Sequence, residues 1–144
     1  MTANFQGRND STEFLKKKLV VLTRVPRILI VDDDAADRFL LKNLLSRYKV
    51  EVVECSNEST AVDIIVNNEF NIVFLDVRLI EGDGFDVYKR VKATKPDQTI
   101  IVMTGYDDVS IREKLLEISP QFFWRKPIKA SDLDNIFETL KPNA

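Results

Sequence analysis

Side chains able to bind a metal ion or a phosphoryl group follow four apolar segments of the sequence, each directly after the apolar run stops. They are Asp32, Asp33, Asp76, Thr104 and Lys126. Three carboxylates lying together repel one another and raise one another's pKa unless a cation lies among them. Oxygen ligands with room for water suit Mg²⁺, which takes a phosphate oxygen as one of its ligands. Together with a hydroxyl and an ammonium, these carboxylates predict a Mg²⁺-dependent receptor for a phosphoryl group.

Asp76 is the strongest candidate for the reacting group, because it ends an apolar run and precedes a loop that turns at Gly82 and Gly84. A carboxylate can attack phosphorus and form an acyl phosphate while a metal ion and a lysine stabilise the charge. The sequence contains no histidine, which excludes a histidine base, nucleophile or metal ligand. Taken alone, Asp76 is equally well explained as a helix cap or a solvated strand end. The other candidate residues favour the chemical interpretation.

The segments between these residues predict strands that alternate with helices. Five alternating pairs predict one parallel sheet with right-handed crossovers and helices on both faces. Because parallel strands all end at the same edge of the sheet, the candidate residues should lie together there. The strands are expected at 28–31, 49–52, 72–76, 99–103 and 122–125, with the second at a sheet edge. Helices are expected at 35–48, 84–94, 107–118 and 131–140, and a further helix, capped by Ser56 or Asn57, carries the apolar residues of 61–65.

Some acidic and polar residues are assigned structural roles. Asp34, Asp37 and Asp83 are interpreted as helix caps. The last helix is expected to begin at Ser131, whose spacing to Asp134 is that of a capping box. The apolar residues of helix 107–118 do not form a clear stripe, so this helix is expected to be marginal and mobile.

The length and composition bound the class of protein. A chain of 144 residues predicts one domain, expected over 27–141 after an N-terminal extension over 1–26 that is flexible or forms a short docking helix. No apolar run approaches the roughly 20 residues of a membrane span, so we expect a cytoplasmic location. The net charge of −2 argues against direct nucleic-acid binding, and the single cysteine excludes an intrachain disulfide.

Five short motifs, in order along the chain, closely resemble the receiver domain of two-component response regulators. The resemblance extends over 27–140, nearly all of the chain after the extension. It implies an α/β, flavodoxin-like (βα)5 fold whose parallel strands have the order 2-1-3-4-5. The motifs are Val31-Asp32-Asp33, Leu75-Asp76, Asp83-Gly84, Thr104-Gly105 and Lys126-Pro127.

This resemblance implies that Asp76 accepts a phosphoryl group from a phosphohistidine on a partner histidine kinase or histidine phosphotransfer protein. Mg²⁺ is implied to bind Asp33, Asp76 and the backbone carbonyl of Arg78, with Asp32 acting through water. The absence of histidine from this chain agrees with a donor on another protein. Beyond self-phosphorylation and slow self-dephosphorylation at Asp76, no multiple-turnover enzyme activity is implied. The phosphoryl oxygens are implied to contact Thr104 and Lys126.

The resemblance also implies a switch formed by Thr104 and Phe123. We expect Phe123 to turn inward after phosphorylation and to change the face made by helix 107–118, strand 122–125 and the last helix. This face is expected to bind a downstream protein or a second copy of the chain.

Several residues beside the predicted site vary within the family. Arg78 and Tyr106 lie at positions that affect the lifetime of the phosphoryl group. We expect Tyr106 to shield it from water and Arg78 to contact it. The sequence departs from the family pattern at Ile80, where proline is usual, and at Gly105, where alanine is common.

Two other functions are consistent with parts of the sequence. The first is a receiver-like docking module that is never phosphorylated, although the intact acidic pair, threonine and lysine argue against it. The second is a small phosphatase of the haloacid-dehalogenase type, because Asp32-Asp33-Asp34 contains its D-x-D pattern. That pattern normally continues to threonine or valine where this chain has Ala36, and the domain is too small for the usual cap.

Overall fold

The computed structural model describes residues 25–79, 81–105 and 108–140, with side chains described as far as residue 138. The described residues form one five-stranded parallel sheet in the order β2-β1-β3-β4-β5. This topology confirms the predicted flavodoxin-like (βα)5 fold. The strands are β1 (Arg27–Val31), β2 (Glu51–Cys55), β3 (Ile72–Asp76), β4 (Ile100–Thr104) and β5 (Phe122–Arg125), and the helices are α2 (Ala35–Leu45), α3 (Glu58–Asn67), α4 (Gly84–Thr94), α5 (Val109–Ile118) and α6 (Ala130–Leu140).

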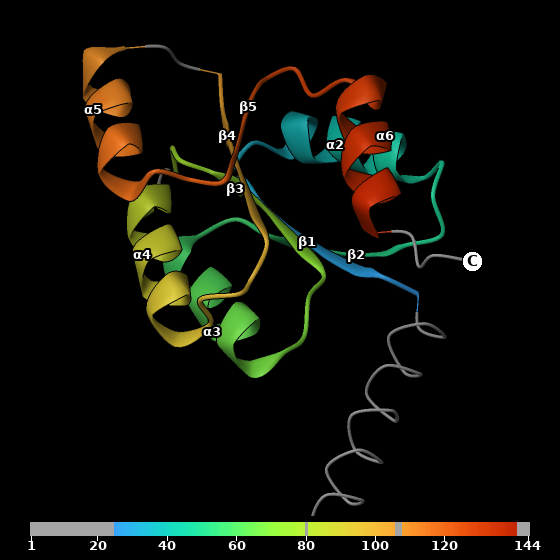
Figure 1. The fold of residues 1–144 in the computed structure, drawn as a ribbon, viewed down its shortest axis with the longest axis horizontal. Coiled ribbons are helices and arrows are strands. Elements are labelled where there is room, and N and C mark those ends of the chain that lie inside the picture. The colour runs from blue at the N-terminus through green and yellow to red at the C-terminus, as the bar shows by residue number, and fades with distance from the viewer. Residues whose placement is uncertain (1–24, 80, 106–107, 141–144) are drawn as a thin grey trace, which may run out of the picture.

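Helices cover both faces of the sheet, with α3, α4 and α5 on one side and α2 and α6 on the other (Figure 1). The central strands therefore bury alternate side chains into two separate apolar cores. In β3, Val73 and Leu75 pack in the first core, whereas Ile72 and Phe74 pack in the second. This two-sided burial explains why the central strands are continuous apolar runs.

The two edge strands, β2 and β5, are partly exposed. The second strand lies at the edge, as the sequence predicts, but begins at Glu51, later than expected. In β5 the exposure alternates, so Phe122 and Trp124 are half-buried while Phe123 faces outward with 39% of its surface exposed. The Trp124 ring contacts Phe74, with 5.8 Å between ring centroids.

Aspartate and asparagine side chains fix the starts of four helices. Asp34 caps α2 by accepting hydrogen bonds from the backbone N–H groups of Ala36 and Asp37, and Asp83 caps α4 in the same way through Phe85. Asn57 and Asp108 cap α3 and α5. The predicted caps at Asp34 and Asp83 are therefore confirmed.

Three predicted helix boundaries are wrong. Helix α5 begins at Val109, after its cap Asp108, rather than at residue 107. Helix α2 ends at Leu45, before the predicted Tyr48, because the Ser46 hydroxyl donates to the carbonyl of Asn43 and the chain turns there. Helix α6 begins at Ala130, before Ser131, because the Asp132 carboxylate accepts the backbone N–H of Lys129 at 2.9 Å. The acid that acts in capping is therefore Asp132, three residues after Lys129, and not the predicted Asp134.

Helix α5 buries little of its surface. Ile111 is its buried residue, whereas Val109 and Leu116 are 67% and 78% exposed. This packing agrees with the poorly sorted apolar pattern of the helix. Across the part of the chain that the structure describes, none of the helices has the length and apolar character needed to cross a bilayer.

Candidate functional site

The carboxyl ends of four strands bring the candidate residues to one edge of the sheet. Asp32 follows β1, Asp76 and Thr104 end β3 and β4, and Lys126 follows β5. Asp32, Asp76 and Thr104 are buried. The backbone N–H of Lys126 donates to the Thr104 carbonyl at 2.9 Å, so β4 and β5 remain paired up to the site.

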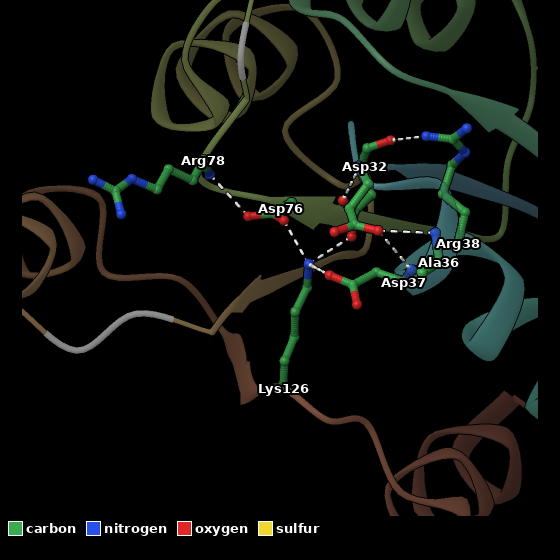
Figure 2. A network of polar contacts seen from close by, with 8 residues as sticks. Asp32, Ala36, Asp37, Arg38, Asp76, Arg78 and Lys126 are labelled. Atoms are coloured by element: carbon green, nitrogen blue, oxygen red, sulfur yellow. Dashed lines mark hydrogen bonds and ion pairs between the residues drawn. The ribbon is translucent and has the colours of Figure 1, made fainter.

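Lys126 connects three carboxylates (Figure 2). Its Nζ lies 2.6 Å from Asp32 Oδ2, 2.6 Å from Asp76 Oδ2 and 2.7 Å from Asp37 Oδ2. An ammonium group has three N–H donors, so all three are used. Each bond is charge-assisted, which makes it shorter and stronger than a bond between neutral groups.

Asp37 belongs to this site, and its predicted role as a helix cap is wrong. Asp34 is the cap of α2, which leaves the Asp37 carboxylate to extend from the first helical turn toward Lys126 (Figure 2). One sequence signal places Asp37 near the site, although it does not show which acid caps the helix. A second acid in the first turn of the helix that begins at a reactive strand end must lie near that strand end, because the turn is short.

Backbone groups hold the two buried carboxylates in fixed orientations. Asp76 Oδ1 accepts the N–H of Arg78 at 2.9 Å, and Asp32 Oδ1 accepts the N–H of Asp34 at 2.9 Å. In both residues the other oxygen, Oδ2, contacts Lys126. The acceptor oxygens are therefore oriented toward one point before any ligand arrives.

The charges of the site favour an added cation. Burial raises the pKa of Asp32 to about 6, against the opposing effects of Lys126 and the backbone N–H of Asp34, while the negative charge of Asp76 raises it further. Burial alone would lower the pKa of Lys126, but the hydrogen bonds that its ammonium donates to Asp32, Asp37 and Asp76 raise it above the usual lysine value. The ammonium therefore stays charged at neutral pH. Counted as ionised, the four carboxylates, Asp33 included, and one ammonium leave a net charge of about −3.

Three of these carboxylates could hold a metal ion. Asp32, Asp33 and Asp76 each offer an oxygen, and these oxygens lie within 4.8 Å of one another. An all-oxygen set of this size fits Mg²⁺, which keeps several water ligands. A divalent ion would reduce the charge of the site to about −1. The three predicted carboxylates, Lys126 and a divalent ion would together be neutral, so the remaining negative charge comes from Asp37.

A tight contact positions the loop behind Asp76. The N–H of Gly84 donates to the Val77 carbonyl at 3.1 Å, and a Cβ at Gly84 would lie 2.2 Å from the Asp76 carbonyl oxygen. Only glycine allows this approach of α4 to the end of β3. Asp76 lies in an open cleft, which is also lined by residues including Asp33, Asp37, Arg78, Gly105 and Lys126.

The structure describes Arg78 and Phe123, two of the residues predicted to modulate or switch the site. Arg78 is exposed, and its guanidinium extends away from Asp76 and Lys126 (Figure 2). Phe123 faces outward on β5. Tyr106 and Ile80 lie outside the described residues. The roles of Arg78, Tyr106 and Phe123 stay predictions.

The parallel order 2-1-3-4-5 and an acidic cluster at the carboxyl edge define a flavodoxin-like domain of the receiver class. Comparison with known families agrees, because the sequence profile described as the response regulator receiver domain matches residues 28–138. The chain therefore belongs to the response regulator receiver domain family. Members of this family act in two-component signalling and are in general not multiple-turnover enzymes.

Two curated relatives illustrate the similarity. The chain is 28% identical over 115 residues to Sporulation initiation phosphotransferase F of Bacillus subtilis (strain 168). This alignment covers 80% of this chain and 90% of that protein. It is 38% identical over 109 residues to Response regulator MprA of Mycobacterium sp. (strain KMS), with 74% of this chain and 46% of MprA covered. The chain thus spans less than half of MprA.

Two solved structures share the fold. A CheY-like response regulator receiver domain protein from Methanospirillum hungatei JF-1 aligns with a TM-score of 0.73 and 28% identity, covering 81% of this chain and 94% of that one. The receiver domain of sensor histidine kinase PA1611 from Pseudomonas aeruginosa PAO1 aligns with a TM-score of 0.74 and 21% identity, covering 82% and 98%. That structure has a magnesium ion coordinated in its active site cleft. At this identity the likeness concerns the fold.

Proposed function

We propose that this chain accepts a phosphoryl group on Asp76 in a cytoplasmic two-component phosphorelay. The donor is a phosphohistidine on a partner histidine kinase or histidine phosphotransfer protein. The observation that carries the proposal is the position of Asp76 Oδ2, 2.6 Å from Lys126 Nζ and in a cluster of carboxylates able to hold Mg²⁺. This arrangement pairs a nucleophile with positive charge where a phosphoryl group gains negative charge.

In the proposed reaction, a carboxylate oxygen of Asp76 attacks the phosphorus atom. The phosphorus–nitrogen bond to the donor imidazole breaks, the imidazole keeps the bonding electrons and takes up a proton, and an acyl phosphate forms on Asp76. Mg²⁺, held by Asp33, Asp76 and the Arg78 carbonyl, with Asp32 acting through water, would neutralise charge on the phosphoryl oxygens. Lys126 exchanges its bond to Asp76 for one to a phosphoryl oxygen, and the Thr104 hydroxyl supplies a second donor.

Mass spectrometry with a small phosphodonor tests this proposal. Incubation with acetyl phosphate and Mg²⁺ should add the mass of one phosphoryl group to the wild-type protein and none to Asp76→Asn, because an amide cannot form the acyl phosphate. Removing Mg²⁺ with a chelator should also abolish labelling. Asp83→Asn is a matched control, since asparagine can still cap α4.

The same measurement separates the other two functions. An unlabelled wild-type protein would indicate a docking module. Repeated release of phosphate from a phosphate ester, with no stable adduct, would indicate a phosphatase.

We further propose that phosphorylation changes the face formed by α5, β5 and α6, which then binds a downstream protein or a second copy of the chain. The exposed apolar residues Val109, Leu116 and Phe123 lie on α5 and β5. Thr104 is paired with Arg125 in the β4–β5 ladder, so a shift of Thr104 toward the phosphoryl group acts directly on β5. In the proposed switch, Phe123 then turns inward.

Hydrogen exchange followed by mass spectrometry can detect this switch. Phosphorylated protein should show altered exchange in peptides from α5 and β5, and little change in α3, which lies away from these elements (Figure 1). Acetyl phosphate added to Asp76→Asn should produce no change. Equal exchange of α5 and β5 in the phosphorylated and unphosphorylated wild type would refute the switch.

A further inference from the structure

The three carboxylates bound to Lys126 differ in their freedom to move. Asp32 and Asp76 are buried at the ends of central strands, with 1% and 8% of their side chains exposed. Asp37 lies in the first turn of α2 and its side chain is 38% exposed. Asp37 therefore binds the same ammonium from the rim of the cleft, outside the buried pair.

We propose that Asp37 is a positioning residue that holds Lys126 in its unphosphorylated position and thereby slows phosphorylation of Asp76. This inference rests on the proposed function of Asp76. It adds a regulatory role for a residue outside the group that binds the metal ion or the phosphoryl group.

The number of donors on Lys126 supplies the argument. All three N–H donors are occupied, so a phosphoryl oxygen can bind the ammonium only if one carboxylate releases it. Formation of the acyl phosphate removes the charge of the Asp76 carboxylate and weakens that bond. The reaction does not modify Asp37, whose carboxylate continues to compete with the phosphoryl group for the same ammonium.

The structure also fixes where Asp37 lies. Its backbone N–H donates to the capping Asp34 carboxylate at 3.2 Å, which anchors the first turn of α2. The next residue, Arg38, donates to the Asp32 carbonyl at 2.7 Å and pairs with Glu54 at 3.4 Å. The first turn is therefore tied to the end of β1, and the Asp37 carboxylate is held beside Lys126 (Figure 2).

The substitution Asp37→Asn tests the inference, because asparagine keeps the size of the side chain and removes its charge. We expect the rate of phosphorylation by acetyl phosphate at saturating Mg²⁺ to rise about threefold to tenfold, because the phosphoryl group no longer competes with a charged carboxylate for a donor of Lys126. Asp86→Asn is the matched control. Asp86 is the third residue of α4, as Asp37 is of α2, so the change in charge and helix position is the same. Its rate should stay close to that of the wild type.

A second comparison shows whether Asp37 acts through Lys126. In a Lys126→Met background, adding Asp37→Asn should leave the slow remaining rate unchanged, because the bond it removes is already lost. The inference is overturned if Asp37→Asn reacts at or below the wild-type rate, if Asp86→Asn accelerates equally, or if the acceleration persists without Lys126. If the Lys126 variant does not fold, the comparison of Asp37→Asn with Asp86→Asn decides by itself. Labelling of the wild type, with none of Asp76→Asn, shows that the proposed function stands even where this inference fails.

Discussion

Replacing Lys126 with methionine should lower the free energy of unfolding of the metal-free protein by about 3 to 5 kcal/mol, the usual cost of removing one partner from a buried ion pair. The lysine side chain is 15% exposed and contacts Asp32 and Asp76, which are nearly inaccessible to water. Methionine is of similar length and apolar, so the main change is the loss of positive charge. Two buried carboxylates would then repel each other without compensation.

Urea unfolding in the presence of a chelator measures this loss. Lys89→Met is the control, because Lys89 forms an ion pair with Glu117 at 2.7 Å on the surface, with side chains 50% and 61% exposed. Exposed pairs contribute little, so that variant should unfold nearly as the wild type does. Adding Asp76→Asn to Lys126→Met should recover part of the loss. A Lys126 variant as stable as the Lys89 variant would show that the carboxylates are compensated by another group.

Replacing Gly84 with alanine should also destabilise the protein strongly, by about 3 kcal/mol, because the new methyl group would overpack a closed contact. The added Cβ would lie 2.2 Å from the Asp76 carbonyl oxygen and 2.5 Å from Val77 Cα. Both are backbone atoms, so relief requires the start of α4 to move away from the end of β3. Because Asp76 is on that strand end, labelling by acetyl phosphate should fall as well.

Gly105→Ala is the matched control for this substitution. A Cβ at Gly105 would lie 3.9 Å from Lys126 Cβ and Cδ, an ordinary van der Waals distance. The change should therefore alter stability by no more than about 0.5 kcal/mol. Thermal unfolding of the two variants side by side gives the comparison. Equal stability would mean that the loop after Asp76 relaxes without cost.

The sheet and its reactive edge could be predicted because both depend on local patterns. Apolar runs that end in Asp76 and Thr104 identify central strands, and parallel topology then places their ends together. The strand over 122–125 was also predicted. The sequence did not show that β5 lies at an edge of the sheet, where its exposure alternates. These features need no knowledge of long-range distances.

The role of Asp37 could not be predicted in the same way. Asp34, Asp37 and Asp83 have the same side chain near helix starts, and the sequence does not show which carboxylate caps and which extends past the helix. That choice depends on the position of Lys126, which is 89 residues further along the chain. The last residue of α2 and the first residue of α6 were missed for a related reason. Each is set by one side-chain hydrogen bond, which the Ser46 hydroxyl donates in α2 and the Asp132 carboxylate accepts in α6.

The pairing of Lys126 with residues from β1 and β3 has a consequence for the order in which the protein is made. A ribosome synthesises Asp32, Asp37 and Asp76 well before Lys126, and β5 can join β4 only after residues 122–125 have emerged. A nascent chain that ends before β5 thus carries the carboxylates without their ammonium partner. The charge balance of the site is therefore complete only once β5 has joined the sheet, and a chain interrupted before β5 should lack the proposed ability to accept a phosphoryl group.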